Sequence, residues 1–202
     1  MSRHHILMAA TVAVALSVAC PAVAEPADPA SLEATLLPVV TAQMAKMHIP
    51  GLIVSVQTPD RGFWQAALGV SDVATRAPMD VSDHVRVGSI TKSFTATVIL
   101  QLAQEGRLGL DDPLAPYFPG VQTNQATIRQ VLQLTSGIAD YTTDSFLNAR
   151  ATAPQRVWAP AELVDLIADE PPMFPAGTDW YYSNTNYVML GIIAEQVTVQ
   201  PL

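Results

Sequence analysis

Hydrophobic positions in the first part of the chain follow two different spacings, which predict one helix and two strands. From Ser31 to Met47 apolar residues recur at helical spacing; Ser31 can cap such a helix, and Pro38 within it favours a kink. The apolar runs over residues 52–56 and 63–70 are separated by a polar turn that contains glycine. They predict an antiparallel hairpin, which needs further strands or a covering helix to be stable.

The remainder of the chain is predicted to be mainly helical. One helix is expected over residues 89–105 and should be ended by Gly106 in a left-handed conformation. Its apolar positions are Ile90, Phe94, Val98 and Leu102. We expect this face, with Phe94 in it, to pack in the core. Further helices are predicted over residues 127–134, 160–167 and 185–197. Residues 136–156 are polar and irregular, which predicts a surface loop.

The first 24 residues have the pattern of a secretory signal peptide. A basic start is followed by an apolar run over residues 6–19, which is too short for a membrane span, and by the small-residue cleavage site Ala22-Val23-Ala24. A lipoprotein signal at Cys20 fits less well, because Ser17 stands three positions earlier, where a bulky aliphatic residue is usual. We therefore expect cleavage after Ala24 and a secreted or periplasmic protein.

Composition excludes several classes of function. The net charge of −8 argues against nucleic acids and anionic membrane surfaces as partners. Because Cys20 is the one cysteine, the region after the leader can hold neither a catalytic thiolate nor a disulfide. His48 and His84 lie in no metal-binding spacing, so we expect no metal site and both side chains in surface or structural roles.

The most informative stretch is Ser89-Ile90-Thr91-Lys92, at the predicted start of a helix. Residues i and i+3 of a helix are surface neighbours, so an unionised Lys92 amine could accept the proton of Ser89 and convert a poor nucleophile into a reactive one. The positive end of the helix dipole and burial both disfavour a lysine cation there. The same spacing arises by chance in many proteins, although this chain has only two lysines, Lys46 and Lys92.

A second motif, Tyr182-x-Asn184, lies in an aromatic-rich turn near the end of the chain. A tyrosine beside a lysine can be held near the phenolate form and carry a proton. An asparagine amide can hold a substrate carbonyl and also bond the lysine. Alone, such a turn is more often structural, but its pairing with the serine motif is specific.

Together these motifs resemble the penicillin-recognising serine hydrolases, which include class C β-lactamases, D-alanyl-D-alanine carboxypeptidases and related esterases. The resemblance covers nearly all of residues 31–202, and one departure is Leu134, where many relatives carry histidine. The segments that carry it are Ile49-Pro50-Gly51, residues 86–96, 105–108 and 127–138, and Tyr182-Ser183-Asn184. It implies an α/β fold of the β-lactamase/transpeptidase type, with one antiparallel sheet flanked by helices, an all-helical region, and the active site at their junction.

The resemblance also implies roles for four residues. Ser89 would be the acylated nucleophile, and its backbone N–H would form half of the oxyanion hole. Lys92 would be its base or proton relay. Tyr182 would share the proton transfer and protonate the leaving group, and Asn184 would orient the substrate amide. No cofactor is implied, because acyl transfer by serine and lysine needs none.

Members of the family carry a third element near their C-terminus, a Lys-Thr-Gly or His-x-Gly segment on a sheet strand. Nothing of that type follows Tyr182 in these 202 residues. We therefore expect residues 25–202 to be a hydrolase domain that is incomplete at its C-terminus, with the C-terminal sheet strands missing. Loss of one oxyanion donor alone lowers the rate by about 10²–10³.

Three hypotheses follow. The first is a secreted serine hydrolase that forms an acyl-enzyme on Ser89; the second is a truncated, inactive remnant or binding module of the same fold; in the third, the Ser89 motif is a coincidence in a structural protein. The substrate class stays open among β-lactams, D-Ala-D-Ala peptides of peptidoglycan and esters, because fold and nucleophile do not choose among these. The sequence does not indicate the oligomeric state.

Overall fold

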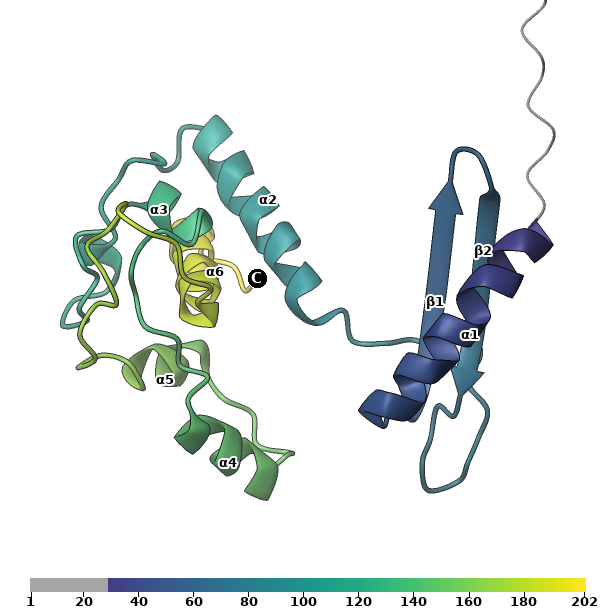
Figure 1. The fold of residues 1–202 in the computed structure, drawn as a ribbon. Coiled ribbons are helices and arrows are strands. Elements are labelled where there is room, and N and C mark those ends of the chain that lie inside the picture. The colour runs from purple at the N-terminus through teal and green to yellow at the C-terminus, as the bar shows by residue number, and fades with distance from the viewer. Residues whose placement is uncertain (1–28) are drawn as a thin grey trace, which may run out of the picture. The chain divides into compact units, whose positions relative to one another are not determined.

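The computed structural model describes residues 29–202, with side chains from Leu32 onward (Figure 1). The signal peptide predicted over residues 1–24 lies outside the described residues. The chain divides into two compact units, one ending at Val85 and the other spanning Arg86–Leu202. No helix among the described residues is both long and apolar enough to cross a membrane.

The first unit consists of helix α1 (Pro29–Met47) and a hairpin of β1 (Gly51–Thr58) and β2 (Gly62–Gly69). The strands are antiparallel, with Gly51 opposite Gly69 and Thr58 opposite Gly62, so the predicted hairpin is confirmed. Helix α1 packs against β2, which buries Leu32 and Trp64. This hairpin is the one sheet that the described residues form.

Helix α1 differs from its prediction at its start and ends as predicted. It begins at Pro29 instead of Ser31, since proline is well suited to the first turn of a helix. It ends where His48 takes a left-handed conformation, with φ 53°. The N–H of His48 then bonds the carbonyl of Ala45, and that of Ile49 bonds the carbonyl of Met44, which satisfies two groups at the helix end.

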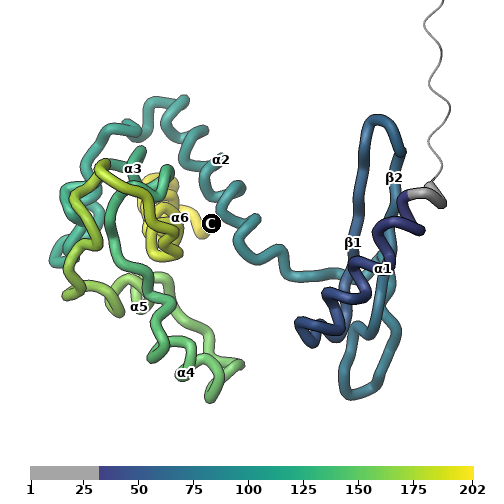
Figure 2. Tube along the Cα trace, viewed as in Figure 1, coloured from purple at the N-terminus to yellow at the C-terminus, as the bar shows by residue number. Residues whose placement is uncertain are grey.

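The second unit is helical. Its elements are η1 (Gly88–Ile90), α2 (Thr91–Gln104), η2 (Ala115–Tyr117), α3 (Ile128–Leu132), α4 (Asp144–Thr152), α5 (Pro160–Asp165) and α6 (Asn184–Thr198). Helix α6 packs against α2, α3 and α5, and Met189, Leu190 and Ile193 on it are fully buried. Figure 2 traces how the chain passes through the shorter helices before it returns in α6. The core of this unit is therefore built around its last helix.

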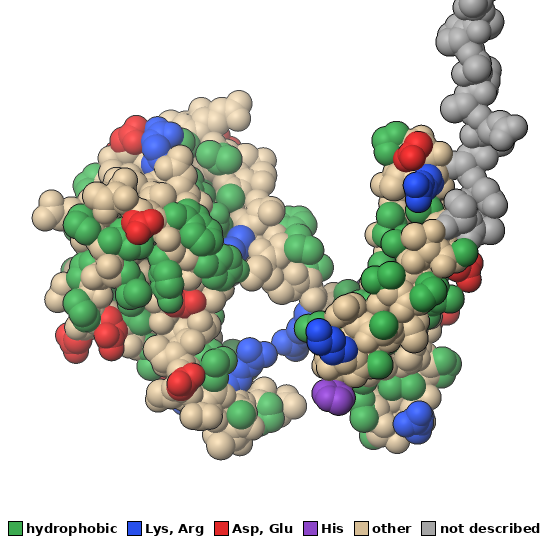
Figure 3. Space-filling view, in the orientation of Figure 1, with side chains coloured by type: hydrophobic (Ala, Val, Ile, Leu, Met, Phe, Trp, Pro, Cys, Tyr) green, Lys and Arg blue, Asp and Glu red, His purple; other side chains and the backbone are tan. Residues whose placement is uncertain are grey.

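The helix predicted over residues 89–105 forms, but its predicted buried face is confirmed only at Val98 and Leu102 and is wrong at Ile90 and Phe94. Ile90 and Phe94 are 61% and 66% exposed, while Ile99 and Leu102 lie in the core. Apolar residues occupy more than one face of α2, so their spacing predicts a helix without deciding which face is buried. Hydrophobic side chains of this kind reach the surface in both units (Figure 3). Gly106 is left-handed as predicted, with φ 70°.

The prediction of a surface loop over residues 136–156 is also wrong. The segment contains α4, which Thr143 caps by accepting a hydrogen bond from the N–H of Phe146, and it begins in the core, where Ser136 is 1% exposed. Gly137, with φ 72°, passes so close to the chain at Phe174 that a Cβ there would lie 2.1 Å from a carbonyl oxygen. Polar side chains in this segment are used for internal hydrogen bonds, which composition alone does not reveal.

Candidate active site

Ser89 lies in a tight turn just before α2. Gly88 has φ 55°, a conformation that favours glycine, and the N–H of Ile90 bonds the carbonyl of Val87 to form the 3₁₀ turn η1. Lys92 follows in the first turn of α2, so that its Nζ lies 3.2 Å from the Oγ of Ser89. The prediction that the two side chains are neighbours is thus confirmed by their geometry.

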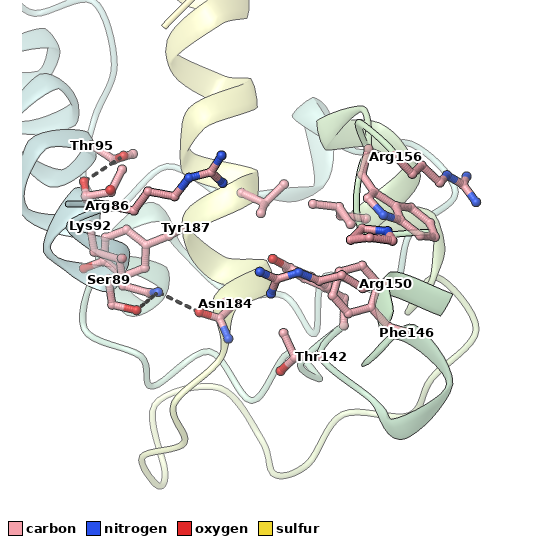
Figure 4. Close-up of a pocket in the computed structure, with 17 residues that line it drawn as sticks. Arg86, Ser89, Lys92, Thr95, Thr142, Phe146, Arg150, Arg156, Asn184 and Tyr187 are labelled. Carbon is pink, nitrogen blue, oxygen red and sulfur yellow. Dashed lines mark hydrogen bonds between the residues drawn. The ribbon is translucent and has the colours of Figure 1, made fainter. Parts of the chain in front are cut away.

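The second predicted pair of residues reaches the same place from about 90 residues further along the chain. The hydroxyl of Tyr182 donates to Ser89 Oγ over 2.7 Å, and Lys92 Nζ donates to Asn184 Oδ1 over 2.7 Å. Figure 4 shows the line of hydrogen bonds from Ser89 through Lys92 to Asn184. The structure therefore brings all four predicted site residues together, whereas their chemical roles stay predictions.

The segment that carries Tyr182 and Asn184 is anchored by buried polar side chains. Ser183, which is extended at the start of α6, donates to the carbonyl of Ala139 over 3.1 Å. Thr185 accepts a hydrogen bond from the backbone N–H of Tyr141 over 3.0 Å. Because Ser183 and Thr185 are 1% and 0% exposed, these bonds hold the start of α6 against the chain at residues 139–141.

Asn186 adds a second anchor on the same turn of α6. Its Oδ1 accepts from Ser136 Oγ over 3.0 Å, and its Nδ2 donates to the carbonyl of Val131 over 3.3 Å. Ser136 Oγ in turn accepts from the N–H of Ile138. Each of these groups is buried and paired, which gives the platform under Asn184 one defined geometry.

Asp140 is a site residue that the sequence did not reveal. Its Oδ2 accepts from Asn184 Nδ2 over 3.0 Å, so that it orients the amide whose oxygen faces Lys92. Thr142 holds the same carboxylate through its Oγ1 at 2.7 Å and its N–H at 3.1 Å. The local signal was an aspartate two residues before a threonine, which is typical of a turn and says nothing of Asn184.

The electrostatics distinguish the two tyrosines on either side of Lys92. The Lys92 Nζ lies 4.7 Å from the ring centroid of Tyr182 and 5.6 Å from that of Tyr187. Hydrogen bonding with Lys92, and then with Ser89, lowers the pKa of Tyr182, which the charge of Asp140 opposes weakly. Burial instead raises the pKa of Tyr187, whose hydroxyl donates to the carbonyl of Leu132 over 2.9 Å. Tyr182 is thus the better suited of the two to carry a proton.

A cavity of about 650 Å³ opens beside these groups within the helical unit. Residues of the site and of the segment around α4 line it together: Arg86, Gly88, Ser89, Thr91, Lys92, Thr95, Tyr141, Thr142, Phe146, Arg150, Pro154, Arg156, Trp158, Leu163, Asn184, Tyr187 and Val188. The sequence pattern singled out none of the arginines among them. Cavities of this size accept small organic molecules.

The described part of the chain also shows whether a metal ion could be held. Within residues 29–202, no three His, Cys, Asp or Glu side chains are placed to hold a metal ion. His48 and His84 are both exposed, as expected for surface histidines.

Comparison with known proteins gives one family. Residues 38–202 match the family model Beta-lactamase. The chain is 31% identical to Protein flp of Staphylococcus aureus over 80% of its length, and 30% identical to Penicillin-binding protein 4* of Bacillus subtilis over 76%. Among solved structures, a D-stereospecific amidohydrolase from Streptomyces sp. superposes with a TM-score of 0.63 at 38% identity, over 75% of this chain.

The matches cover only part of those proteins. The chain spans about a third of the curated relatives, 33% of Protein flp and 34% of Penicillin-binding protein 4*, and 46% of the amidohydrolase. The family model covers both the segment that carries Ser89 and the segment that carries Asn184, since both lie within residues 38–202.

Proposed function

The chain belongs to the Beta-lactamase family, and from that premise we propose that it is a serine hydrolase that cleaves an amide or ester through an acyl-enzyme on Ser89. The observation that carries the proposal is the contact of Ser89 Oγ with two proton-carrying groups, Lys92 Nζ at 3.2 Å and the Tyr182 hydroxyl at 2.7 Å. A serine oxygen with such neighbours meets the first requirement for nucleophilic catalysis.

In the first step Ser89 Oγ attacks the substrate carbonyl carbon and gives its proton to Tyr182 or Lys92. The lowered pKa of Tyr182 favours its phenolate as the immediate acceptor, with the Lys92 cation stabilising the negative charge. Tyr182 then returns the proton to the leaving amine or alcohol as the bond from the carbonyl carbon to that group breaks. The acyl group remains on Ser89.

In the second step a water molecule attacks the acyl carbon, and the same groups take its proton and restore Ser89. The bond between Ser89 Oγ and the acyl carbon breaks, which releases a carboxylic acid. Asn184 positions the amide of the substrate and also holds Lys92 over 2.7 Å, and Asp140 keeps the Asn184 amide in that orientation. Positioning of this kind supplies a large part of the rate enhancement in acyl transfer.

A fluorophosphonate probe tests this proposal directly. We expect the full-length protein to be labelled covalently at Ser89, with the modified residue located by mass spectrometry, and Ser89→Ala to remain unlabelled. Ser93→Ala is the matched control, because Ser93 lies in the same turn, is exposed and makes no side-chain hydrogen bond among the described contacts. Labelling that persists in Ser89→Ala would refute the proposal.

The alternative is an inactive remnant or binding module of the same fold. Measurable turnover of a β-lactam, a D-Ala-D-Ala peptide or an ester by the purified protein would exclude it. Binding of a penicillin without turnover or acylation would favour it.

We also propose that residues 1–24 are a secretory signal peptide, so that residues 25–202 belong to a secreted or periplasmic hydrolase domain. The likeness to a penicillin-binding protein supports an extracytoplasmic substrate. N-terminal sequencing of the protein isolated from the cell envelope or medium tests this, with Glu25 as the expected first residue. An intact Met1 in that fraction would contradict it.

A further inference from the structure

The cavity beside Ser89 has an unusual charge for this protein. Four of the ten Lys and Arg residues of the chain line it, namely Arg86, Lys92, Arg150 and Arg156, while none of its lining residues is Asp or Glu. The chain as a whole carries a net charge of −8. A concentration of cations in an acidic protein points to an anionic ligand.

Three of these cations have no ion pair within the described part of the chain, and two of the three, Arg86 and Arg150, have no hydrogen-bond partner either. Arg156 forms an ion pair with Glu162 at 3.1 Å and stacks on Trp158 at 3.6 Å, so it serves as part of the wall. No hydrogen bond or ion pair within residues 29–202 engages the guanidinium of Arg86 or Arg150. Figure 4 shows both of these guanidinium groups directed into the cavity, whereas that of Arg156 points away.

The carboxylate of Asp140 lies close to the cavity and offsets part of its positive charge. Asp140 bonds Asn184 at 3.0 Å and is held by Thr142, but it does not line the cavity. Its one negative charge can offset only one of the three positive charges of Lys92, Arg86 and Arg150. The cavity therefore keeps an excess of positive charge, in which Arg150 and Arg86 have donors free for a carboxylate.

The position of the cavity relative to Tyr182 decides which part of a substrate it holds. The cavity is lined by Ser89, Lys92 and Asn184 but not by Tyr182. In the proposed reaction Tyr182 protonates the leaving group, so that group lies on the Tyr182 side of Ser89. The cavity, which Tyr182 does not line, is then left for the acyl group, the part that stays bound to Ser89.

We infer that the substrate carries an anionic acyl group, with a carboxylate that Arg150 and Arg86 bind while the apolar chain of the acyl group lies along Phe146 and Val188. This inference rests on the proposed function, because it uses the acylation of Ser89 and the role of Tyr182. A half-ester or half-amide of a dicarboxylic acid has this chemistry. A substrate whose only negative charge is on its leaving group does not.

A matched pair of chromogenic esters tests the inference. Mono-p-nitrophenyl adipate and p-nitrophenyl hexanoate have acyl chains of equal length and the same leaving group, and only the first carries a carboxylate on the acyl group. We expect the full-length protein to favour the adipate ester in kcat/KM. We expect Arg150→Gln to lower the adipate-to-hexanoate ratio at least about tenfold and Arg86→Gln to lower it in the same direction.

Controls separate charge recognition from other effects. Arg61→Gln changes an exposed arginine outside the cavity and should leave the ratio unchanged. An equal fall in kcat/KM for both esters in Arg150→Gln would mean that the residue supports the fold, and would count against the inference. A ratio unaffected by Arg150→Gln and Arg86→Gln would overturn the inference. So would a preference for 4-acetoxybenzoate, whose charge is on the leaving group, over the adipate ester.

A binding measurement keeps the inference testable if no ester is cleaved. Adipamic acid and hexanamide differ only in the carboxylate, and their binding to Ser89→Ala can be compared by ligand-observed NMR. Tighter binding of adipamic acid that is lost in Ser89→Ala/Arg150→Gln would uphold the anionic subsite while the proposed catalysis fails. Equal binding of the two compounds would overturn the subsite itself.

Discussion

The two segments that meet at the site are held in the molecule in opposite ways. Around Ser89 the chain is presented at the surface, where Val87 and Ile90 are 51% and 61% exposed. At the start of α6, Ser183 and Thr185 are 1% and 0% exposed and are hydrogen-bonded to another part of the chain. A nucleophile needs access to substrate, whereas the groups that orient it need a rigid support, and the fold assigns these tasks to different segments.

Lys92 joins the exposed segment to the buried one, because its Nζ bonds both Ser89 Oγ and Asn184 Oδ1. We expect Lys92→Ala to lower kcat/KM by about 10²–10⁴, the range of a proton-transferring group, while the melting temperature changes little. Steady-state kinetics and a thermal melt measure the two effects. Lys46→Ala, in the first unit, is the control. Retained activity in Lys92→Ala would show that the two segments do not depend on each other through this residue.

Asn186→Ala tests the buried support. The change leaves Ser136 Oγ and the carbonyl of Val131 without their partner and removes a fully buried side chain. We expect the free energy of unfolding to fall by about 2–4 kcal/mol, measured by urea denaturation. Gln196→Ala on the same helix is the matched control, because Gln196 is exposed and makes one long hydrogen bond of 3.5 Å. Equal effects of the two changes would refute the proposed anchor.

Asp140 tests the link between the two segments, because it connects the buried support to the reacting groups. Asp140→Ala removes the acceptor that orients Asn184, and we expect kcat/KM to fall about 10- to 100-fold. Asp140→Asn keeps an acceptor oxygen at the same position and should lose less. An unchanged kcat/KM in Asp140→Ala would show that the Asn184 amide is oriented without it.

The pH profile gives a second readout for Asp140. Lys92 lowers the pKa of Tyr182, so the phenolate fraction, and kcat/KM with it, should rise with pH and level off below the usual tyrosine pKa of about 10. The charge of Asp140 raises the pKa of Tyr182, so Asp140→Asn should move this limb to lower pH. A limb that moves to higher pH, or that survives in Tyr182→Phe, would contradict the assignment of Tyr182 as base.

The smallest effect is expected for Ser93→Ala, within the exposed segment itself. Ser93 is exposed, so we expect the free energy of unfolding to change by less than about 0.5 kcal/mol and kcat/KM by less than about twofold. Denaturation and steady-state assays on the same preparation measure both. A large loss of activity would mean that a second hydroxyl in this turn takes part in the reaction.

Predictions that rest on interactions between near neighbours in the sequence were accurate, and those that depend on packing between distant segments were not. The neighbouring positions of Ser89 and Lys92 follow from helical geometry alone. The left-handed Gly106 was equally local, and the structure has it. In contrast, the buried face of α2 was wrong at Phe94, because the choice between apolar faces depends on where α6 packs.

Short motifs and recurrent spacings in the amino-acid sequence were enough to predict the hairpin, most of the helices and the family, and to single out Ser89, Lys92, Tyr182 and Asn184, whereas α4 was missed. Only the tertiary structure decided that Asp140 supports Asn184 and that Arg86 and Arg150 face the cavity beside Ser89. The physical reason is that hydrogen bonds and charges act between atoms a few ångströms apart, and the packing of α6 against the rest of the helical unit brings together side chains that the sequence keeps tens of residues apart.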